Sequence, residues 1–170
     1  ESDYSGSIVR YFLLMGRSLQ QTTRWSNWAG NQQTGSVLVS RPQTESELQQ
    51  VVQSAQASGR RVKAVGSGHS FTAIAVAEEV LVDLSNYDEI IAIDKINQTV
   101  TVQSGIQLSK LNQALYENSL AMQNLGDIAY QTIAGAISTS THGTGANFTG
   151  IANQVVALRI VLADSSIVEC

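Results

Sequence analysis

Residues 60–71 organise this chain, and they read Arg-Arg-Val-Lys-Ala-Val-Gly-Ser-Gly-His-Ser-Phe. The residues before the first glycine predict a strand over 61–65, and the Gly-Ser-Gly turn that follows it presents His69. Two glycines this close allow a main-chain path on which backbone N–H groups converge on an anion. A glycine-rich turn alone is a weak signal, so its meaning depends on what the rest of the chain supplies.

The residues before this turn predict a compact β-α-β unit. Residues 37–40 are a strand candidate, and Thr44 with Glu47 makes a capping box for a helix that continues to about Ser58. Gly59 is a natural end for that helix. Strand, helix, glycine and strand therefore follow one another, and the glycine-rich turn is the loop after the second strand.

The chain after the turn predicts further strands and a second helix. Strands are expected over residues 80–84, 90–94, 99–103, 154–163 and 167–170, and a helix over residues 108–118. In that helix we expect Leu108, Leu111, Leu115 and Tyr116 to face the core. Strands and helices in this order predict an α+β fold.

The N-terminal residues carry two further patterns. Residues 8–15 fit one side of a short helix, so we expect residues 1–21 to be a helical extension that packs on the protein. A membrane-surface helix and a trimmed targeting remnant are the alternatives. Trp25 and Trp28 are spaced for one helical face, which favours lid or core anchors over a binding box.

Composition limits the classes of function. The chain has 170 residues, of which 43% are apolar and 14% charged, as in a globular domain or two small lobes that share a core. A net charge of −4 argues against a nucleic-acid surface, and no apolar run approaches the roughly 20 residues of a membrane span. One cysteine, expected to be buried at Cys170, and two histidines predict no metal site. Arg61 and Lys63 alternate on a strand and predict a solvated face.

A second unusual stretch runs from residue 124 to residue 145, where small residues and hydroxyls dominate and charge is nearly absent. Such a segment suits a backbone that lies close against a large flat ligand. With the glycine-rich turn as a phosphate cradle, it favours a dinucleotide cofactor. The spacing is wrong for a Rossmann fingerprint, because no G-x-G-x-x-G opens a helix.

Several spaced motifs occur in the order typical of one known family. They are Val-Gly-Ser-Gly-His-Ser at 65–70, Val-Gln-Ser-Gly-Ile-Gln-Leu at 102–108, Asn-Leu-Gly at 124–126, Ile-Ala-Gly-Ala-Ile at 133–137, Thr-His-Gly-Thr-Gly at 141–145 and Asn-Gln-Val-Val-Ala-Leu at 153–158. From residue 22 to residue 170 the chain resembles the FAD-binding domain (PCMH-type) of the vanillyl-alcohol oxidase superfamily. Within that superfamily it is most similar to sugar-1,4-lactone oxidases (gulonolactone and arabinonolactone oxidases) and alditol oxidases.

The resemblance implies a two-lobed α+β domain that binds FAD. Its lobes would cover roughly residues 36–85 and 86–170, with a small mainly parallel sheet, a larger mixed sheet and flanking helices. Members of the family continue into a second, C-terminal domain that meets the substrate. The resemblance therefore implies that this chain is a fragment without catalytic residues. The complete oxidase would act on a sugar lactone or polyol with dioxygen, and peripheral membrane association is compatible with it.

The resemblance also implies roles for individual residues. The loop Gly66, Ser67, Gly68, His69 and Ser70 would hold the pyrophosphate, and His69 would bond covalently to the 8α-methyl of the flavin. Gly126 would lie beside flavin C4a as an oxygen gate, which favours an oxidase over a dehydrogenase. The residues expected to line the ribityl chain and the ring are Asp127, Thr132, Gly135, Ala136, Ile137 and Ser138, with His142 close behind.

Blander interpretations stand beside these assignments. His69 could be an unbonded turn histidine, the glycines could serve turns and close packing, and Asp127 could be a helix cap. The enzyme alternatives are a lactone dehydrogenase with a cytochrome acceptor and the flavin-dependent reductase that builds peptidoglycan sugar nucleotides. The alternative from another class is a non-catalytic binding module that recruits a partner through Trp25 and Trp28.

Overall fold

The computed structural model describes residues 22–170, so the helix expected for residues 8–15 lies outside the described part of the chain. The first half of that part folds around a four-stranded sheet in the order β1-β2-β4-β3. Strands β2, β4 and β3 run parallel and β1 is antiparallel, which agrees with the expected mainly parallel sheet. The strands are β1 (Thr22–Thr23), β2 (Val37–Ser40), β3 (Val62–Val65) and β4 (Val80–Asp83).

Helix α2 (Glu45–Ala57) connects β2 to β3, as the capping signal predicts. Thr44 Oγ1 accepts a hydrogen bond from the Glu47 backbone N–H at 3.2 Å, and the Glu47 carboxylate accepts one from the Gln43 N–H at 2.7 Å. These bonds satisfy N–H groups that the start of a helix leaves without partners. Gly59, with a φ of 64°, turns the chain into β3.

Strand β4 is the centre of this half, because Val80, Leu81 and Val82 are all buried. On one face of the sheet Val80 and Val82 pack against α2 through Val51 and Ala55. On the other face Leu81 packs with Val37, Val65 and Ala77. A strand buried on both faces reads as a continuous apolar run, as this one does.

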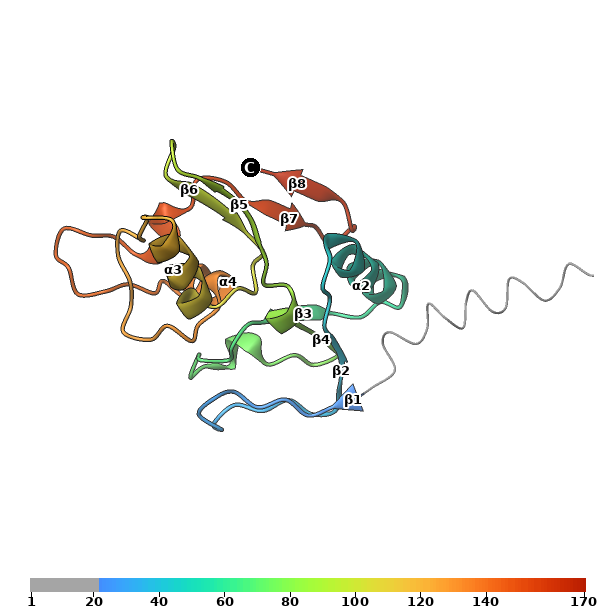
Figure 1. The fold of residues 1–170 in the computed structure, drawn as a ribbon. Helices are drawn as coiled ribbons and strands as arrows, with labels where there is room; N and C mark the ends of the chain where they lie inside the picture. The colour runs from blue at the N-terminus through green and yellow to red at the C-terminus, as the bar shows by residue number, and fades with distance from the viewer. Residues whose placement is uncertain (1–21) are drawn as a thin grey trace, which may run out of the picture.

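The second half carries a hairpin of β5 (Ile90–Asp94) and β6 (Thr99–Val102), covered by α3 (Leu108–Glu117) (Figure 1). Leu111 and Leu115 pack with Ile106 against the apolar side of the hairpin. The inward placement predicted for Tyr116 is wrong, because its side chain is 79% exposed. It follows Leu115 directly and is therefore rotated by about 100° around the helix, away from the hairpin.

A last hairpin of β7 (Arg159–Val161) and β8 (Ile167–Glu169) lies beside the N-terminal end of α2 (Figure 1). Glu45 accepts hydrogen bonds from Arg159, and Gln49 Nε2 donates to the Ser165 carbonyl at 2.9 Å. The strand predicted from residue 154 begins only at Arg159, because a short 3-10 helix, η4 (Ile151–Gln154), occupies the preceding residues. Within residues 22–170 the two hairpins are separate two-stranded sheets and do not form one larger sheet.

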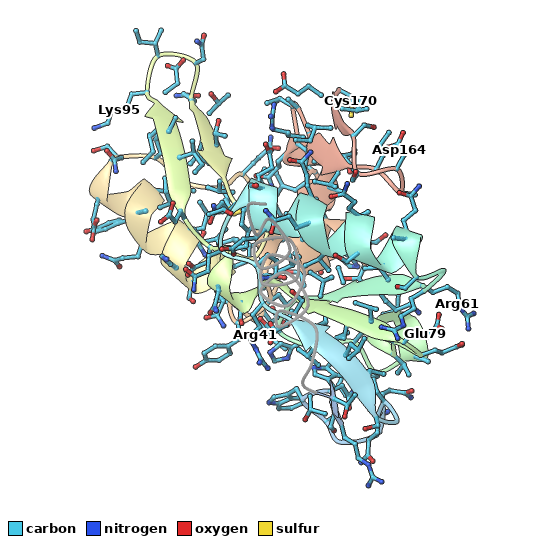
Figure 2. The ribbon with its side chains drawn as sticks, turned by 90° about the vertical axis from the view of Figure 1, so that its right-hand side faces the viewer. Arg41, Arg61, Glu79, Lys95, Asp164 and Cys170 are labelled. Carbon is cyan, nitrogen blue, oxygen red and sulfur yellow. The ribbon has the colours of Figure 1, made fainter. Side chains whose placement is uncertain are left out.

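Three smaller expectations have clear outcomes. Trp25 and Trp28 lie in an extended and turning segment instead of a helix. Cys170 is exposed, so its expected burial is wrong: the residue directly follows β8, a strand that within the described chain is paired on one side only, with β7. Arg61 lies beside Glu79 at the edge of the molecule with its side chain 74% exposed, which confirms the predicted solvated face (Figure 2).

A short helix that the sequence pattern did not predict, α4 (Ile133–Ser138), completes the second half. Its residue Ala136 is fully buried with Leu108 and Ile151. The remaining short elements are the 3-10 helices η2 (Ala73–Ala75) and η3 (Leu84–Asn86). Of the helices in residues 22–170, none has the length and apolar character needed to cross a membrane.

Candidate functional site

The loop of residues 66–71 leaves β3 and is held by the turn of residues 27–32. Asn27, which is only 5% exposed, donates from Nδ2 to the Ser70 carbonyl at 2.9 Å. The Trp28 N–H donates to the Gly68 carbonyl at 2.9 Å, and Asn31 and Gln32 donate to the Phe71 carbonyl at 3.1 and 3.2 Å. Three carbonyls of the loop are therefore bonded to one neighbouring turn.

The N–H groups of the same loop are left available. From Ser67 to Phe71, no backbone N–H has a hydrogen-bond partner in the part of the chain that the structure describes. Ser67, Gly68, His69 and Ser70 line a cavity, so a ligand there can reach this segment of backbone. Consecutive N–H groups without partners form a concavity that suits an anion.

The segment that carries α4 packs directly against this loop. A Cβ atom built on Gly66 would overlap Thr132 Oγ1, so only glycine fits there without a shift. Thr132 is itself 3% exposed, and its Oγ1 accepts from the Gly135 N–H at 3.2 Å as the N-cap of α4. Gly68 adopts a φ of 66°, which side chains disfavour.

The start of α4 is not a second anion site, because its N–H groups have partners. The Ile133 and Ala134 N–H groups donate to the carbonyls of Ile106 and Ser104 at 2.9 and 3.0 Å. The Gly135 N–H is bonded to the Thr132 hydroxyl as described above. In return, the Leu108 N–H donates to the Gln131 carbonyl at 2.9 Å. The motif at 102–108 and residues 131–134 are thus joined by backbone hydrogen bonds.

Two adjoining cavities border these loops, with volumes of about 670 and 150 Å³. The larger volume lies within the range of small-molecule and cofactor sites. Both cavities are lined by Gly66, Ser67, His69 and Thr132. The larger one extends over Tyr130 and Gln107 to the pair Lys110–Asp88, whose Nζ–Oδ2 distance is 2.7 Å; the smaller one extends along α4.

The structure brings together most of the predicted site residues. The residues that border a cavity are Gly66, Ser67, Gly68, His69, Ser70, Thr132, Gly135 and Ser138. Ala136 and Ile137 lie in or against the core cluster around Leu108, on the other side of α4. Asp127 and His142 are exposed and line neither cavity, and His142 Nδ1 donates to the Gly143 carbonyl at 2.9 Å.

The predicted gate residue Gly126 also lies outside both linings. A Cβ built on it would be 3.0 Å from Thr141 Cγ2 and 3.4 Å from the His142 carbonyl oxygen. A methyl group added at residue 126 would therefore be tightly packed, but small shifts of the neighbouring atoms could accommodate it.

Sequence reasoning missed the aromatic part of the site. The imidazole of His69 lies between Trp28 and Tyr130, with ring-centroid distances of 5.5 and 6.5 Å and interplanar angles of 28° and 16°. Trp28 was singled out by its spacing with Trp25, whereas Tyr130 carried no signal beyond its place in the 124–145 stretch. Gln107 lies within the 102–108 motif and Lys110 follows it by two residues, which was a usable signal. No group of three or more His, Cys, Asp or Glu side chains that could hold a metal occurs in residues 22–170.

Comparison with known families assigns the domain. The sequence model of a family described as "FAD binding domain" matches residues 36–170. The chain belongs to this FAD binding domain family. The predicted resemblance to FAD-binding domains of the vanillyl-alcohol oxidase superfamily is thereby confirmed.

Relatives of this FAD binding domain include lactone-oxidising enzymes. Over 145 residues it is 40% identical to an L-gulono-1,4-lactone dehydrogenase of Mycobacterium tuberculosis, covering 85% of this chain and 34% of that protein. Over 147 residues it is 33% identical to an L-gulonolactone oxidase of Mus musculus, covering 86% and 33%. The chain thus spans about a third of the length of these relatives.

Among solved structures, a solvent-stable cholesterol oxidase has the same fold as this FAD binding domain. It superposes with a TM-score of 0.75 at 23% identity, over 88% of this chain and 32% of that one. This confirms the predicted α+β fold class of the PCMH-type FAD-binding domain. The two cavities also fit the cofactor, because their walls combine residues with unbonded N–H groups, Ser67 to Ser70, with a glycine, Gly66, at which no side chain fits without a shift.

Proposed function

We propose that residues 22–170 are the FAD-binding domain of an oxidase that takes a hydride from a sugar-derived lactone or polyol. The observation that carries this proposal is the row of unbonded N–H groups from Ser67 to Phe71, in a loop that borders two adjoining cavities of about 670 and 150 Å³. Such a row suits the pyrophosphate of a dinucleotide. The substrate class follows the names of the relatives, which are a gulonolactone dehydrogenase and a gulonolactone oxidase.

Within this site the chain's own residues bind and orient the cofactor. The loop from Gly66 to Ser70 holds the pyrophosphate, and Thr132, Gly135 and Ser138 border the flavin side of the cavity. FAD, when bound, supplies the redox chemistry by accepting the hydride and passing two electrons to dioxygen. Asp127, Ala136, Ile137 and His142 stay predictions, because none of them lines either cavity.

His69 is the residue through which we expect the flavin to be attached covalently. Its side chain borders both cavities, and the loop that carries it is bonded to the 27–32 turn. A fixed imidazole edge at the cavity is what attack on the 8α-methyl carbon requires. The bond would also withdraw electron density from the flavin and make it a stronger oxidant.

Flavin content after denaturation tests the proposal. The protein as the cell makes it should be yellow when purified, and the flavin should stay with the polypeptide in acid or SDS. His69→Ala should release the flavin on denaturation and keep part of the non-covalent binding. A colourless wild-type protein would refute FAD binding and favour the binding-module alternative. Colour that washes out of the wild-type protein would remove only the covalent link.

A second candidate is a lactone dehydrogenase that passes electrons to a cytochrome. It is favoured by the 40% identity to the mycobacterial L-gulono-1,4-lactone dehydrogenase. The oxidase reading is favoured by Gly126, where the family resemblance implies a small residue beside flavin C4a. Peroxide production with lactone as donor separates the two: an oxidase consumes one dioxygen for each lactone, whereas a dehydrogenase turns over only with an added acceptor.

A further inference from the structure

The imidazole of His69 is flanked by two aromatic rings. Trp28 lies over the ring at a centroid distance of 5.5 Å, and Tyr130 lies near it at 6.5 Å. Both interplanar angles, 28° and 16°, describe stacked rings. Trp28 in turn contacts Phe71 edge to face at 6.4 Å. These distances fall within the range at which aromatic rings attract one another.

Neither ring nitrogen of His69 has a hydrogen-bond partner in residues 22–170, so no such bond fixes the ring. Functional histidines are commonly oriented by a hydrogen bond to one nitrogen. Here the orientation comes from the two stacked rings. Stacking restricts the plane of the ring and leaves its edge free, and Trp28, His69 and Tyr130 line one cavity together.

The two aromatic residues are themselves placed by the loops of the site. The Trp28 backbone N–H is bonded to the Gly68 carbonyl at 2.9 Å, next to His69. Tyr130 lies between Ala129 and Gln131, whose carbonyls accept from the Ser109 and Leu108 N–H groups at 2.8 and 2.9 Å. Yet their side chains are 68% and 65% exposed, so the core does not need them. Because packing of the core does not explain these two rings, we look for their role at the site around His69.

We propose that Trp28 and Tyr130 are positioning residues that orient His69 for covalent attachment of the flavin. This inference rests on the proposed function. In the net reaction His69 loses its N–H hydrogen, the 8α-methyl carbon loses one hydrogen, and a C–N bond joins them. The two hydrogens and their two electrons pass to dioxygen, which becomes hydrogen peroxide. The rings take no part in the bond changes and act through the orientation of the imidazole.

The test separates attachment from binding. Wild-type protein, Trp28→Leu and Tyr130→Leu are produced without flavin and incubated with FAD. Bound flavin is measured before denaturation and covalent flavin after it, by fluorescence of the denatured polypeptide over time. Because Trp28 and Tyr130 also line the larger cavity, attachment is followed at FAD concentrations that saturate each variant. Under these conditions we expect both variants to form the covalent link about 10- to 100-fold more slowly than the wild type, as misplacement of a reacting group by about 1 Å can cost. Trp28→Phe should restore most of the rate.

Controls make each outcome decisive. Tyr116→Leu removes an aromatic ring that is 79% exposed and lines neither cavity, and should attach flavin at the wild-type rate. Attachment at that rate in Trp28→Leu and Tyr130→Leu, with none in His69→Ala, would overturn the positioning role and leave the proposed function intact. Equal loss of bound and covalent flavin would also overturn it, in favour of a binding role. A wild-type protein that binds FAD without forming a covalent link would overturn the positioning role and leave FAD binding intact, whereas one that binds no FAD would refute both.

Discussion

The Oγ1 atom of Thr132 occupies the space that a side chain at Gly66 would need. One residue follows β3 and the other caps α4, so this contact joins the two glycine-rich motifs of the sequence. Thr132 cannot retreat easily, because it is buried and its hydroxyl is bonded to the Gly135 N–H at 3.2 Å. The contact therefore sets how closely the loop that follows β3 approaches α4.

Gly66→Ala should push the two motifs apart. We expect a loss of about 1–3 kcal/mol in the free energy of unfolding, as for other overpacked sites, together with weaker binding of FAD. Urea denaturation and FAD titration measure the two effects. Gly35→Ala is the matched control, because a Cβ there meets nothing within 4 Å. Equal results for the two variants would contradict the close contact.

Asn27→Ala should release the loop that carries His69. The change removes the bond to the Ser70 carbonyl and leaves buried polar groups without partners, which costs about 1–3 kcal/mol. The affinity for FAD should fall together with the stability, because the loop that carries the unbonded N–H groups is then held less firmly. Asn118→Ala removes a similar side-chain bond, to the Ala114 carbonyl at 2.8 Å, away from the site. Asn118→Ala should lower the free energy of unfolding without a specific effect on FAD affinity. An equal loss of FAD affinity in the two variants would contradict this prediction.

The contact between α2 and the last hairpin should depend on pH. The hydrogen bond from Arg159 lowers the pKa of Glu45 below its ordinary value. A lowered carboxyl pKa contributes stability above the unfolded value, about 4.3, and that contribution is lost as the pH falls through the folded value. The stability difference between wild type and Glu45→Gln, measured by urea denaturation, should therefore shrink below about pH 4. Arg159→Gln should remove the same pH dependence. A stability difference between wild type and Glu45→Gln that stays constant with pH would contradict this prediction.

Gly126→Ala tests the oxygen gate. Its methyl group would press on Thr141 Cγ2 at 3.0 Å, and we expect it to slow the reaction of reduced flavin with dioxygen more than reduction by substrate. Stopped-flow absorbance of the flavin follows both half-reactions. Gly150→Ala is the control, since its Cβ would lie 3.3 Å from the carbonyl oxygen of the same Thr141. Equal slowing of both half-reactions in Gly126→Ala would show that the gate argument is wrong.

Local signals made the first half of the domain predictable. The helix start at Thr44, its end before Gly59 and the apolar run of β4 are properties of neighbouring residues, and the structure has them where the sequence indicates. The loop at Gly66 was predictable for the same reason. Its glycines mark a backbone conformation that few other residues adopt.

Contacts between distant segments were not predictable in this way. Helix α4 is only six residues long, too short for a clear periodic pattern, and its first N–H groups are satisfied by carbonyls at Ser104 and Ile106. The rings around His69 come from Trp28 and Tyr130, which neither spacing nor composition connects to it. Nothing local distinguishes Ala136, which faces the core, from Gly135, which borders the cavity.

The bonds from Arg159 to Glu45 and from Gln49 to Ser165 join residues 114 and 116 positions apart in the chain. Contacts between such distant residues form late, because the chain must first lose the entropy of closing a long loop. During synthesis, α2 leaves the ribosome long before the hairpin that covers its N-terminal end. The N-terminal end of α2 therefore stays exposed to solvent until the last part of the domain has been made.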